Sequence, residues 1–284
     1  MANARSRVAV VTDSTAYLPE SLCKTHEIAV VPVQVVIGGS VSDETDVSAA
    51  EVAQALRDWT PVSTSRPTPQ SFLSTYEQLV AQGATGIVSV HLSSDMSATI
   101  ESATLAARGL SVPVAVVDSR SIGMALGFAA VSAAECAAQG GDLEQVVAVA
   151  ERRAASSSVF FYVDTLEYLR RGGRIGAAAA LVGSALSVKP LLQLVDGRVE
   201  PFEKVRTTSR ALARLEEVAV DRAGDRAVDV AVQHLANAER AETLARRLAE
   251  RVPGLSELVV NEIGAVVGAH VGPGTISVMV CPRV

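Results

Sequence analysis

Residues 88–99 read VSVHLSSDMSAT, and four hydroxyl side chains in this stretch (Ser93, Ser94, Ser97 and Thr99) follow the apolar run 87–90. The run is typical of a buried strand, and residues 99–108 behind it are typical of a helix. Hydroxyls at such a junction cap the helix, bind an anion or include a nucleophile. Taken alone, Ser97 is more often the N-cap of the following helix than a ligand-binding residue. This role is compatible with an anion site, because the same helix end presents unpaired N–H groups.

Two further segments combine hydroxyls or a histidine with a restricted backbone. Residues 63–69, STSRPTP, contain prolines that fix the backbone and hydroxyls that can cap the helix predicted after them. Residues 268–275, GAHVGPGT, place His270 beside a tight turn that can approach a ligand. A histidine there can donate to a carboxylate. Each segment alone also fits a purely structural role, whereas three in one chain point more strongly to a binding site.

The sequence lacks the usual motifs of nucleotide-binding enzymes. The turn after the first apolar run reads TDST instead of GxGxxG, and no GxxxxGK loop followed by Ser or Thr occurs. The glycine-rich stretch 172–176, GGRIG, follows a helix-like segment, whereas a phosphate loop follows a strand. We therefore expect no ATP site and no cofactor belonging to this chain.

Serine hydrolase chemistry has weak support. No GxSxG nucleophile elbow is present. Ser97, Asp118 and His270 occur in the order of an α/β-hydrolase triad, but this order arises easily by chance in a chain of 284 residues. A serine-dependent acyl hydrolase remains an alternative.

Composition excludes several other classes. The net charge of −6 and the pI near 5.3 argue against a nucleic-acid partner. The longest apolar stretch, 175–188, is too short to cross a bilayer and is interrupted by glycine and serine. The cysteines (Cys23, Cys136 and Cys281) form no CxxC pair and the four histidines are scattered, so we expect no metal site, no disulfide framework and a cytoplasmic location.

The first half of the chain alternates between two patterns. Apolar runs occur at 8–11, 28–37, 87–90 and 114–117, and helix-like stretches at 49–59, 70–81, 99–108 and 125–139. Continuous apolar strands separated by helices predict a mostly parallel sheet with helices on both faces. Three of these runs lead into polar ends, VVTDST, SVHLSSD and VVDSRS. Ligands bind beyond the carboxyl ends of such strands.

The second half has a mixed pattern. A hairpin is predicted for 191–195 and 198–205, because Asp196-Gly197 suits a tight turn. A helix at 208–223, a strand at 228–234, a helix at 238–251 and strands at 257–263 and 275–281 follow. We predict a two-domain α/β protein with a parallel-sheet domain at 1–157 and a mixed-sheet α/β domain at 158–284.

Seven motifs together resemble those of the DegV family, whose members include the fatty-acid-binding subunit of bacterial fatty acid kinase. They are VVTDSTAYLP, TSRPTP, HLSSDMSAT, VVDSRSIGMALG, LEYLRRGGRIG, KVRTTSRAL and HVGPG. The resemblance runs from about residue 8 to the C-terminus, with the motifs in order. It implies a long-chain fatty acid in an apolar tunnel, with its carboxylate near the domain interface. In members with this role, a separate ATP-dependent kinase subunit phosphorylates that carboxylate, and the acyl phosphate enters phospholipid synthesis.

Carried onto this chain, the resemblance implies carboxylate binding by Thr64, Ser97 and His270 and by the backbone N–H of Ala98. Arg174 and Arg206 match arginines near the mouth of the site, where they would meet phosphate or the kinase. No catalytic residue, metal or membrane anchor is implied, and membrane contact would be transient. A carrier of another amphiphilic acid, such as a retinoid or isoprenoid acid, is a further alternative.

Three positions depart from the family pattern. Ala98 replaces the usual glycine after the serine, which puts a methyl group where glycine allows close approach. Arg66 replaces the common glutamine of the TSQP motif and would add positive charge if it faced the site. The segment KVRT lacks the usual glycine before Arg206.

Overall fold

The computed structural model describes residues 7–181 and 189–284, which group into two compact units. Unit 1 comprises the described residues up to Val33 together with Arg66–Ala155 and Val284. Unit 2 comprises Gln34–Ser65 and Ser156–Arg283. Each unit has its own sheet and its own buried core, as predicted for a two-domain α/β chain.

Unit 1 is built on a four-stranded sheet in the order β2-β1-β6-β7, with every neighbouring pair parallel. The strands are β1 (Val8–Asp13), β2 (Ala29–Val31), β6 (Gly86–His91) and β7 (Val114–Asp118). The helices are η1 (Ser14–Ala16), α1 (Glu20–Thr25), α3 (Pro69–Ala81), α4 (Thr99–Ala107), α5 (Met124–Ala138) and α6 (Leu143–Ser156). The prediction of a parallel sheet for this half is confirmed.

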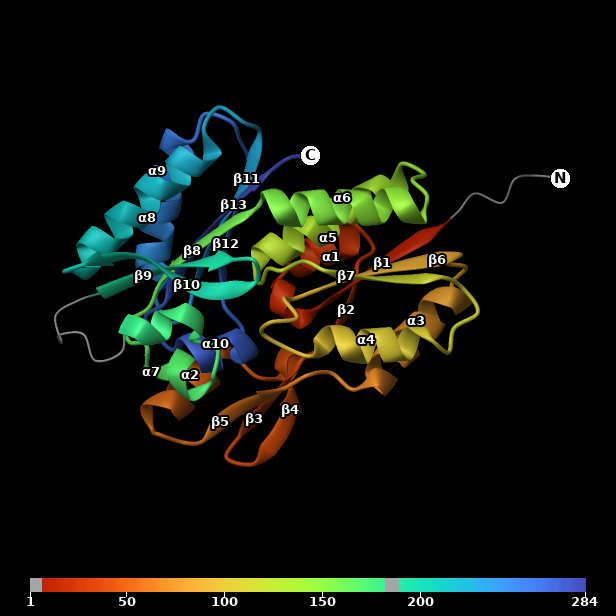
Figure 1. Cartoon of the computed structure of the whole chain (residues 1–284), viewed down its shortest axis with the longest axis horizontal. Coiled ribbons are helices and arrows are strands. Elements are labelled where there is room, and N and C mark those ends of the chain that lie inside the picture. The colour runs from red at the N-terminus through yellow and green to blue at the C-terminus, as the bar shows by residue number, and fades with distance from the viewer. Residues whose placement is uncertain (1–6, 182–188) are drawn as a thin grey trace. The chain divides into compact units, whose positions relative to one another are not determined.

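Helices cover both faces of this sheet, α5 and α6 on one and α3 and α4 on the other (Figure 1). Val10 and Val88 pack against α5 and α6, whereas Val11 and Ile87 pack against α3 and α4. Because successive strand residues point to opposite faces, strands buried on both faces must be apolar throughout, as these are.

Unit 2 contains a six-stranded sheet in the order β10-β9-β8-β13-β11-β12, in which only the β11–β12 pair is parallel. Its strands are β8 (Ser158–Tyr162), β9 (Lys189–Val195), β10 (Arg198–Val205), β11 (Val228–His234), β12 (Leu255–Glu262) and β13 (Ile276–Pro282). Asp196 and Gly197, with φ of 47° and 82°, form the predicted tight turn. The mixed sheet is confirmed.

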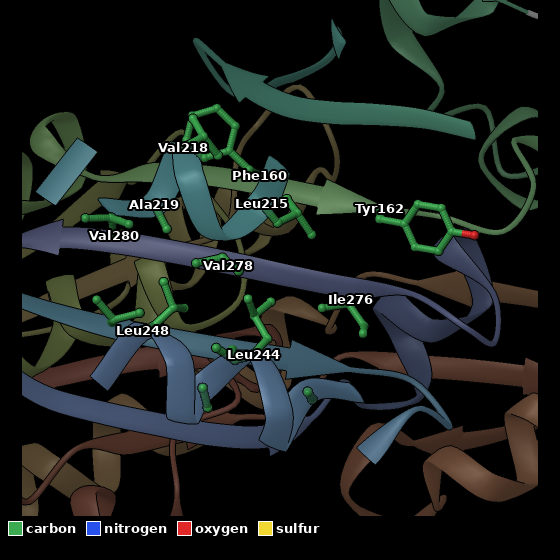
Figure 2. Packing of buried hydrophobic residues seen from close by; sticks show 14 of the residues in the cluster. Phe160, Tyr162, Leu215, Val218, Ala219, Leu244, Leu248, Ile276, Val278 and Val280 are labelled. Atoms are coloured by element: carbon green, nitrogen blue, oxygen red, sulfur yellow. The ribbon is translucent and has the colours of Figure 1, made fainter. Parts of the chain in front are cut away.

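The helices of this part are α7 (Glu167–Arg171), η3 (Gly176–Leu181), α8 (Thr208–Ala223), α9 (Ala238–Arg251) and α10 (Ala265–Val271). Figure 2 shows the main core, in which Leu215 and Val218 of α8 and Leu244 of α9 pack with Ile276 and Val278 of β13. Burial of such side chains is worth about 1.5–3 kcal/mol each, so this core holds α8 and α9 against the sheet.

Residues 34–65 form a small antiparallel sheet in the order β4-β3-β5, with one 3-10 helix and one α-helix. Its elements are β3 (Gln34–Ile37), β4 (Ser40–Asp43), η2 (Glu44–Asp46), α2 (Ala49–Arg57) and β5 (Val62–Ser65). This segment groups with unit 2, unlike the contiguous division at 157/158 predicted from the sequence. The reason is contact with α10: the buried Glu44 carboxylate accepts the N–H of Val266 at 2.8 Å.

Two apolar stretches predicted from the sequence, 28–37 and 175–188, can be compared with the structure. The apolar run 28–37 is not one strand, because Pro32 and Val33 separate β2 of unit 1 from β3 of unit 2. Part of the apolar stretch 175–188, residues 182–188, lies outside the described residues. In the described part of the chain, no helix is long and apolar enough to span a membrane.

Candidate functional site

Thr64 and His270, which lie 206 positions apart in the sequence, meet in unit 2. Oγ1 of Thr64 lies 2.9 Å from Nε2 of His270, which is hydrogen-bond distance. Thr64 lies on β5, where it pairs with Val35 of β3. His270 lies in the last turn of α10, which ends at Gly272 with a φ of 77° that favours glycine. The structure therefore brings together two of the predicted site residues.

His270 is held in its neutral form by its surroundings. Burial, followed by the positive charge of Arg174, lowers the pKa of His270 to about 4. Its Nδ1 is buried and has no hydrogen-bond partner among the described residues. The imidazole is therefore neutral at pH 7, and the positive charge of Arg174 lies close enough to act on it. A neutral hydroxyl–imidazole pair close to a positive charge suits the binding of an anion.

The two predicted arginines differ in their environment. Arg174 is half-buried, and its Nη1 donates to the carbonyl of Gly172 at 2.6 Å. Arg206 is exposed at the end of β10, directly before Thr207, which caps α8 by accepting the N–H of Arg210. Arg174 thus contributes charge to the environment of His270, whereas Arg206 presents its side chain to solvent.

Ser97 lies in unit 1, and the prediction that it caps the following helix is wrong. The N-cap of α4 is Ala98, which provides no side-chain hydrogen bond. The Ser97 hydroxyl lies 2.9 Å from that of Thr99, and the Ser97 N–H donates to the carbonyl of Ser93. The Ser93–Ser97 turn places Ser97 one residue before the cap. Ser97 and Ala98 belong to unit 1, whereas Thr64 and His270 belong to unit 2.

A buried carboxylate, which the sequence did not single out as a site residue, fixes the start of the Ser97 loop. Asp13 accepts the N–H of Leu92 at 3.0 Å and that of Thr15 at 3.1 Å, and its Oδ2 lies 3.0 Å from Nδ1 of His91. Asp13 and His91 are fully buried. Because Leu92 directly precedes Ser93, Asp13 ties the end of β1 to the residue from which the loop starts. An acid at the strand end, two residues after the apolar run 8–11, was the available signal.

The network continues from His91 toward α3. The Tyr76 hydroxyl donates to Oγ of Ser89 at 2.8 Å, and that Oγ lies 2.7 Å from Nε2 of His91. Because the Asp13 carboxylate only accepts, Nδ1–H of His91 donates to it, and in the neutral ring Nε2 then accepts the proton of Ser89, which itself accepts from Tyr76. Burial raises the pKa of Tyr76 to about 12. The chain of donors therefore runs in one direction and ends on the carboxylate.

The residues of the hypothetical Ser97–Asp118–His270 triad are engaged in other contacts. Asp118 accepts the Ser94 hydroxyl at 2.6 Å and the Arg120 N–H at 2.8 Å. Nε2 of His270 meets Thr64. These contacts engage the side chains of Asp118 and His270 with partners other than Ser97.

The remaining segment, 63–69, behaves largely as predicted. Thr68 caps α3 by accepting the N–H of Ser71, with Pro69 in the first turn, so the predicted cap is confirmed. Arg66 forms an ion pair of 2.5 Å with Glu101 of α4. The positive charge of Arg66, which replaces the glutamine common in the family, is therefore paired within unit 1. In the described ranges, no group of three His, Cys, Asp or Glu side chains could hold a metal ion.

Comparison with known proteins gives consistent results over the whole chain. The model of the DegV family of uncharacterised proteins matches residues 7–283. A DegV domain-containing protein of Streptomyces coelicolor is 58% identical over 277 residues, covering 97% of this chain and 99% of that protein. A DegV domain-containing protein of Mycobacterium tuberculosis is 36% identical and covers 96% of each chain.

Two solved structures share the fold. A DegV family protein from Thermus thermophilus, described by its fatty acid binding, has a TM-score of 0.92 at 33% identity, covering 97% of this chain and 99% of that one. DegV of Bacillus subtilis, described as a fatty acid binding protein, has a TM-score of 0.89 at 32% identity, covering 98% and 100%. The family match over residues 7–283 and the relative with 58% identity lead to one conclusion: the chain belongs to the DegV family.

Proposed function

We propose that the protein binds a long-chain fatty acid and presents its carboxylate to a separate ATP-dependent kinase subunit, which converts it to an acyl phosphate. The observation that carries the proposal is the Thr64–His270 hydrogen bond beside the charge of Arg174. Solved relatives described as fatty acid binding proteins support the choice of ligand. Ser97 and the backbone N–H of Ala98 are the contribution proposed for unit 1.

The tail and the head group of a fatty acid would contribute differently to the free energy of binding. Burial of methylenes contributes roughly 0.8 kcal/mol each, so a long acyl tail offers on the order of 10 kcal/mol. A hydrogen bond to a charged group contributes about 1.5–3 kcal/mol. Affinity therefore comes mainly from the apolar tunnel proposed for the tail, and the polar residues orient the carboxylate.

Ligand identity is tested on the purified protein. We expect native mass spectrometry and solvent extraction to find a co-purified fatty acid, and the delipidated protein to take up added fatty acid. A retinoid or isoprenoid acid in the extract would replace the fatty acid in the proposal. Protein that is empty as purified and takes up no fatty acid would overturn it. Ester hydrolysis that is lost in Ser97→Ala would favour the hydrolase alternative.

The kinase step has its own test. Arg174→Ala is expected to keep most of the fatty acid affinity, because the buried tail supplies most of it, and to slow phosphorylation of the bound acid by a fatty acid kinase subunit, because the arginine would meet the phosphate or the kinase. Arg240→Ala, at an exposed position of α9, is the matched control for loss of one positive charge. Equal phosphorylation of the two variants and the unmodified protein would remove this role from Arg174.

A further inference from the structure

Gly172, at the end of α7, lies directly against the His270 ring. A Cβ added at Gly172 would be 2.0 Å from Nδ1 and 2.8 Å from Cε1 of His270. Gly172 has a φ of −73°, a conformation that any residue adopts. The backbone therefore does not require glycine at this position. The imidazole does, because only a hydrogen fits between the Gly172 Cα and Nδ1.

This contact decides which ring nitrogen carries the proton. One Cα–H bond of Gly172 takes the direction of the missing Cβ and therefore points toward Nδ1 of His270. If Nδ1 carries a lone pair, it accepts that hydrogen in a weak C–H···N contact. If Nδ1 is protonated, its hydrogen would clash with the Gly172 hydrogen. Nδ1 also has no acceptor among the described residues. The neutral ring therefore carries its proton on Nε2.

The position of that proton sets the direction of the hydrogen bond to Thr64. Oγ1 of Thr64 lies 2.9 Å from Nε2 of His270, so in this tautomer Nε2–H is the donor and Thr64 the acceptor. The Thr64 hydroxyl proton is then free to donate elsewhere. With the opposite tautomer, the Thr64 hydroxyl would donate its only proton to Nε2. It could then only accept hydrogen bonds from a ligand.

We propose that Gly172 is a positioning residue that fixes His270 as the Nε2–H tautomer, so that Thr64 donates to the ligand and the site selects a head group that accepts hydrogen bonds. This inference rests on the proposed function and adds the physical basis of head-group selection. An ionised carboxylate, which only accepts, matches a Thr64 donor, and the charge of Arg174 acts in the same sense.

The tautomer is measured directly by nitrogen-15 NMR of the histidine side chains in the delipidated protein at pH 7. The signals of His270 are assigned by their loss in His270→Gln. We expect a protonated Nε2 and an unprotonated Nδ1. A protonated Nδ1, whether in the neutral ring or in an imidazolium, would overturn the proposal without touching fatty acid binding.

The consequence for binding is measured with one fatty acid and three variants. Thr64→Val keeps the side-chain shape and removes the donor, so the affinity should fall about tenfold or more. Thr64→Ser should restore most of it, and Ser63→Ala, an exposed hydroxyl on the same strand, should leave it unchanged. An unchanged affinity in Thr64→Val would mean that Thr64 does not donate to the ligand. Absence of binding by the unmodified protein would instead reject the proposed function.

Gly172 itself is tested by a double-variant comparison. Gly172→Ala should displace the ring and lower fatty acid affinity, and it should cost stability only while His270 is present. In a His270→Ala background, Gly172→Ala should therefore change the melting temperature little, because the added methyl group no longer meets a ring. An equal loss of stability in both backgrounds would contradict the assigned contact.

Discussion

The carboxylate of Asp13 and the imidazole of His91 form a hydrogen bond of 3.0 Å in the interior of unit 1, with both side chains fully buried. The two residues end adjacent parallel strands, β1 and β6. Asp13 also accepts the N–H of Leu92, so one carboxylate links two strand ends to the loop that carries Ser97. Asp13 therefore supports the loop that carries Ser97 through hydrogen bonds in the interior of unit 1.

Asp13→Ala should destabilise unit 1 strongly. The change leaves the N–H groups of Thr15 and Leu92 and the Nδ1–H of His91 without an acceptor in a buried place. Loss of one partner from such a pair costs about 3–5 kcal/mol. Urea unfolding measures the change, and Asp225→Ala at an exposed site is the control. A loss below about 1 kcal/mol would contradict the role assigned to Asp13.

Ser89→Ala and Tyr76→Phe test the direction of the donor chain. Ser89→Ala leaves the Tyr76 hydroxyl without its acceptor and Nε2 of His91 without its donor, so we expect a loss of about 1–3 kcal/mol. Tyr76→Phe removes only the first donor and should cost less. In a double-mutant cycle, the two changes together should cost less than their sum. Strict additivity of the two unfolding free energies would show that the residues act independently.

Glu44 holds the helix on which His270 lies. Its carboxylate accepts the N–H of Val266 in the first turn of α10, where a negative charge also meets the positive end of the helix dipole. Glu44→Ala should cost about 1–2 kcal/mol of stability and should also weaken fatty acid binding. Glu44→Gln retains an acceptor and should recover most of both, and Glu77→Ala, at an exposed site, is the control. Unchanged binding in a destabilised Glu44→Ala would limit the residue to stability.

The local hydrophobic pattern was sufficient to predict those helices and strands whose buried face is determined by their own residues. The predicted bounds 208–223, 228–234 and 238–251 agree with those of α8, β11 and α9. Features that depend on distant contacts were not predictable in this way. The grouping of residues 34–65 with unit 2 depends on the contact of Glu44 with Val266, 222 positions away, and the role of Asp13 depends on His91, 78 positions away.

The Ser97 cap fails for a different physical reason. A serine directly before a helix-like run is the usual N-cap signal, but hydrogen bonds from the N–H groups of Met96 and Ser97 to the Ser93 carbonyl close a turn first. The helix then begins one residue later, at the Ala98 cap. The Thr64–His270 contact was anticipated only through the family resemblance, since no spacing rule links β5 to α10.

The stability of the protein should depend on His270 between pH 4 and pH 6.5. Burial and the charge of Arg174 lower the pKa of the folded residue to about 4, whereas the ordinary value of 6.5 applies to the unfolded chain. Above pH 6.5 both states are neutral and His270 contributes no pH dependence. Between these values only the unfolded state takes up the proton, so stability falls as the pH falls, by about 3 kcal/mol in total.

His270→Gln isolates this effect from the titration of the carboxylates. The variant lacks the titrating group, so its unfolding free energy should decline less than that of the unmodified protein between pH 7 and pH 4. The difference between the two curves should open below about pH 6.5 and level off near pH 4. Curves that run parallel over this range would mean that His270 has the same pKa in the folded and unfolded states. The conclusion that the imidazole beside Thr64 is kept neutral would then be wrong.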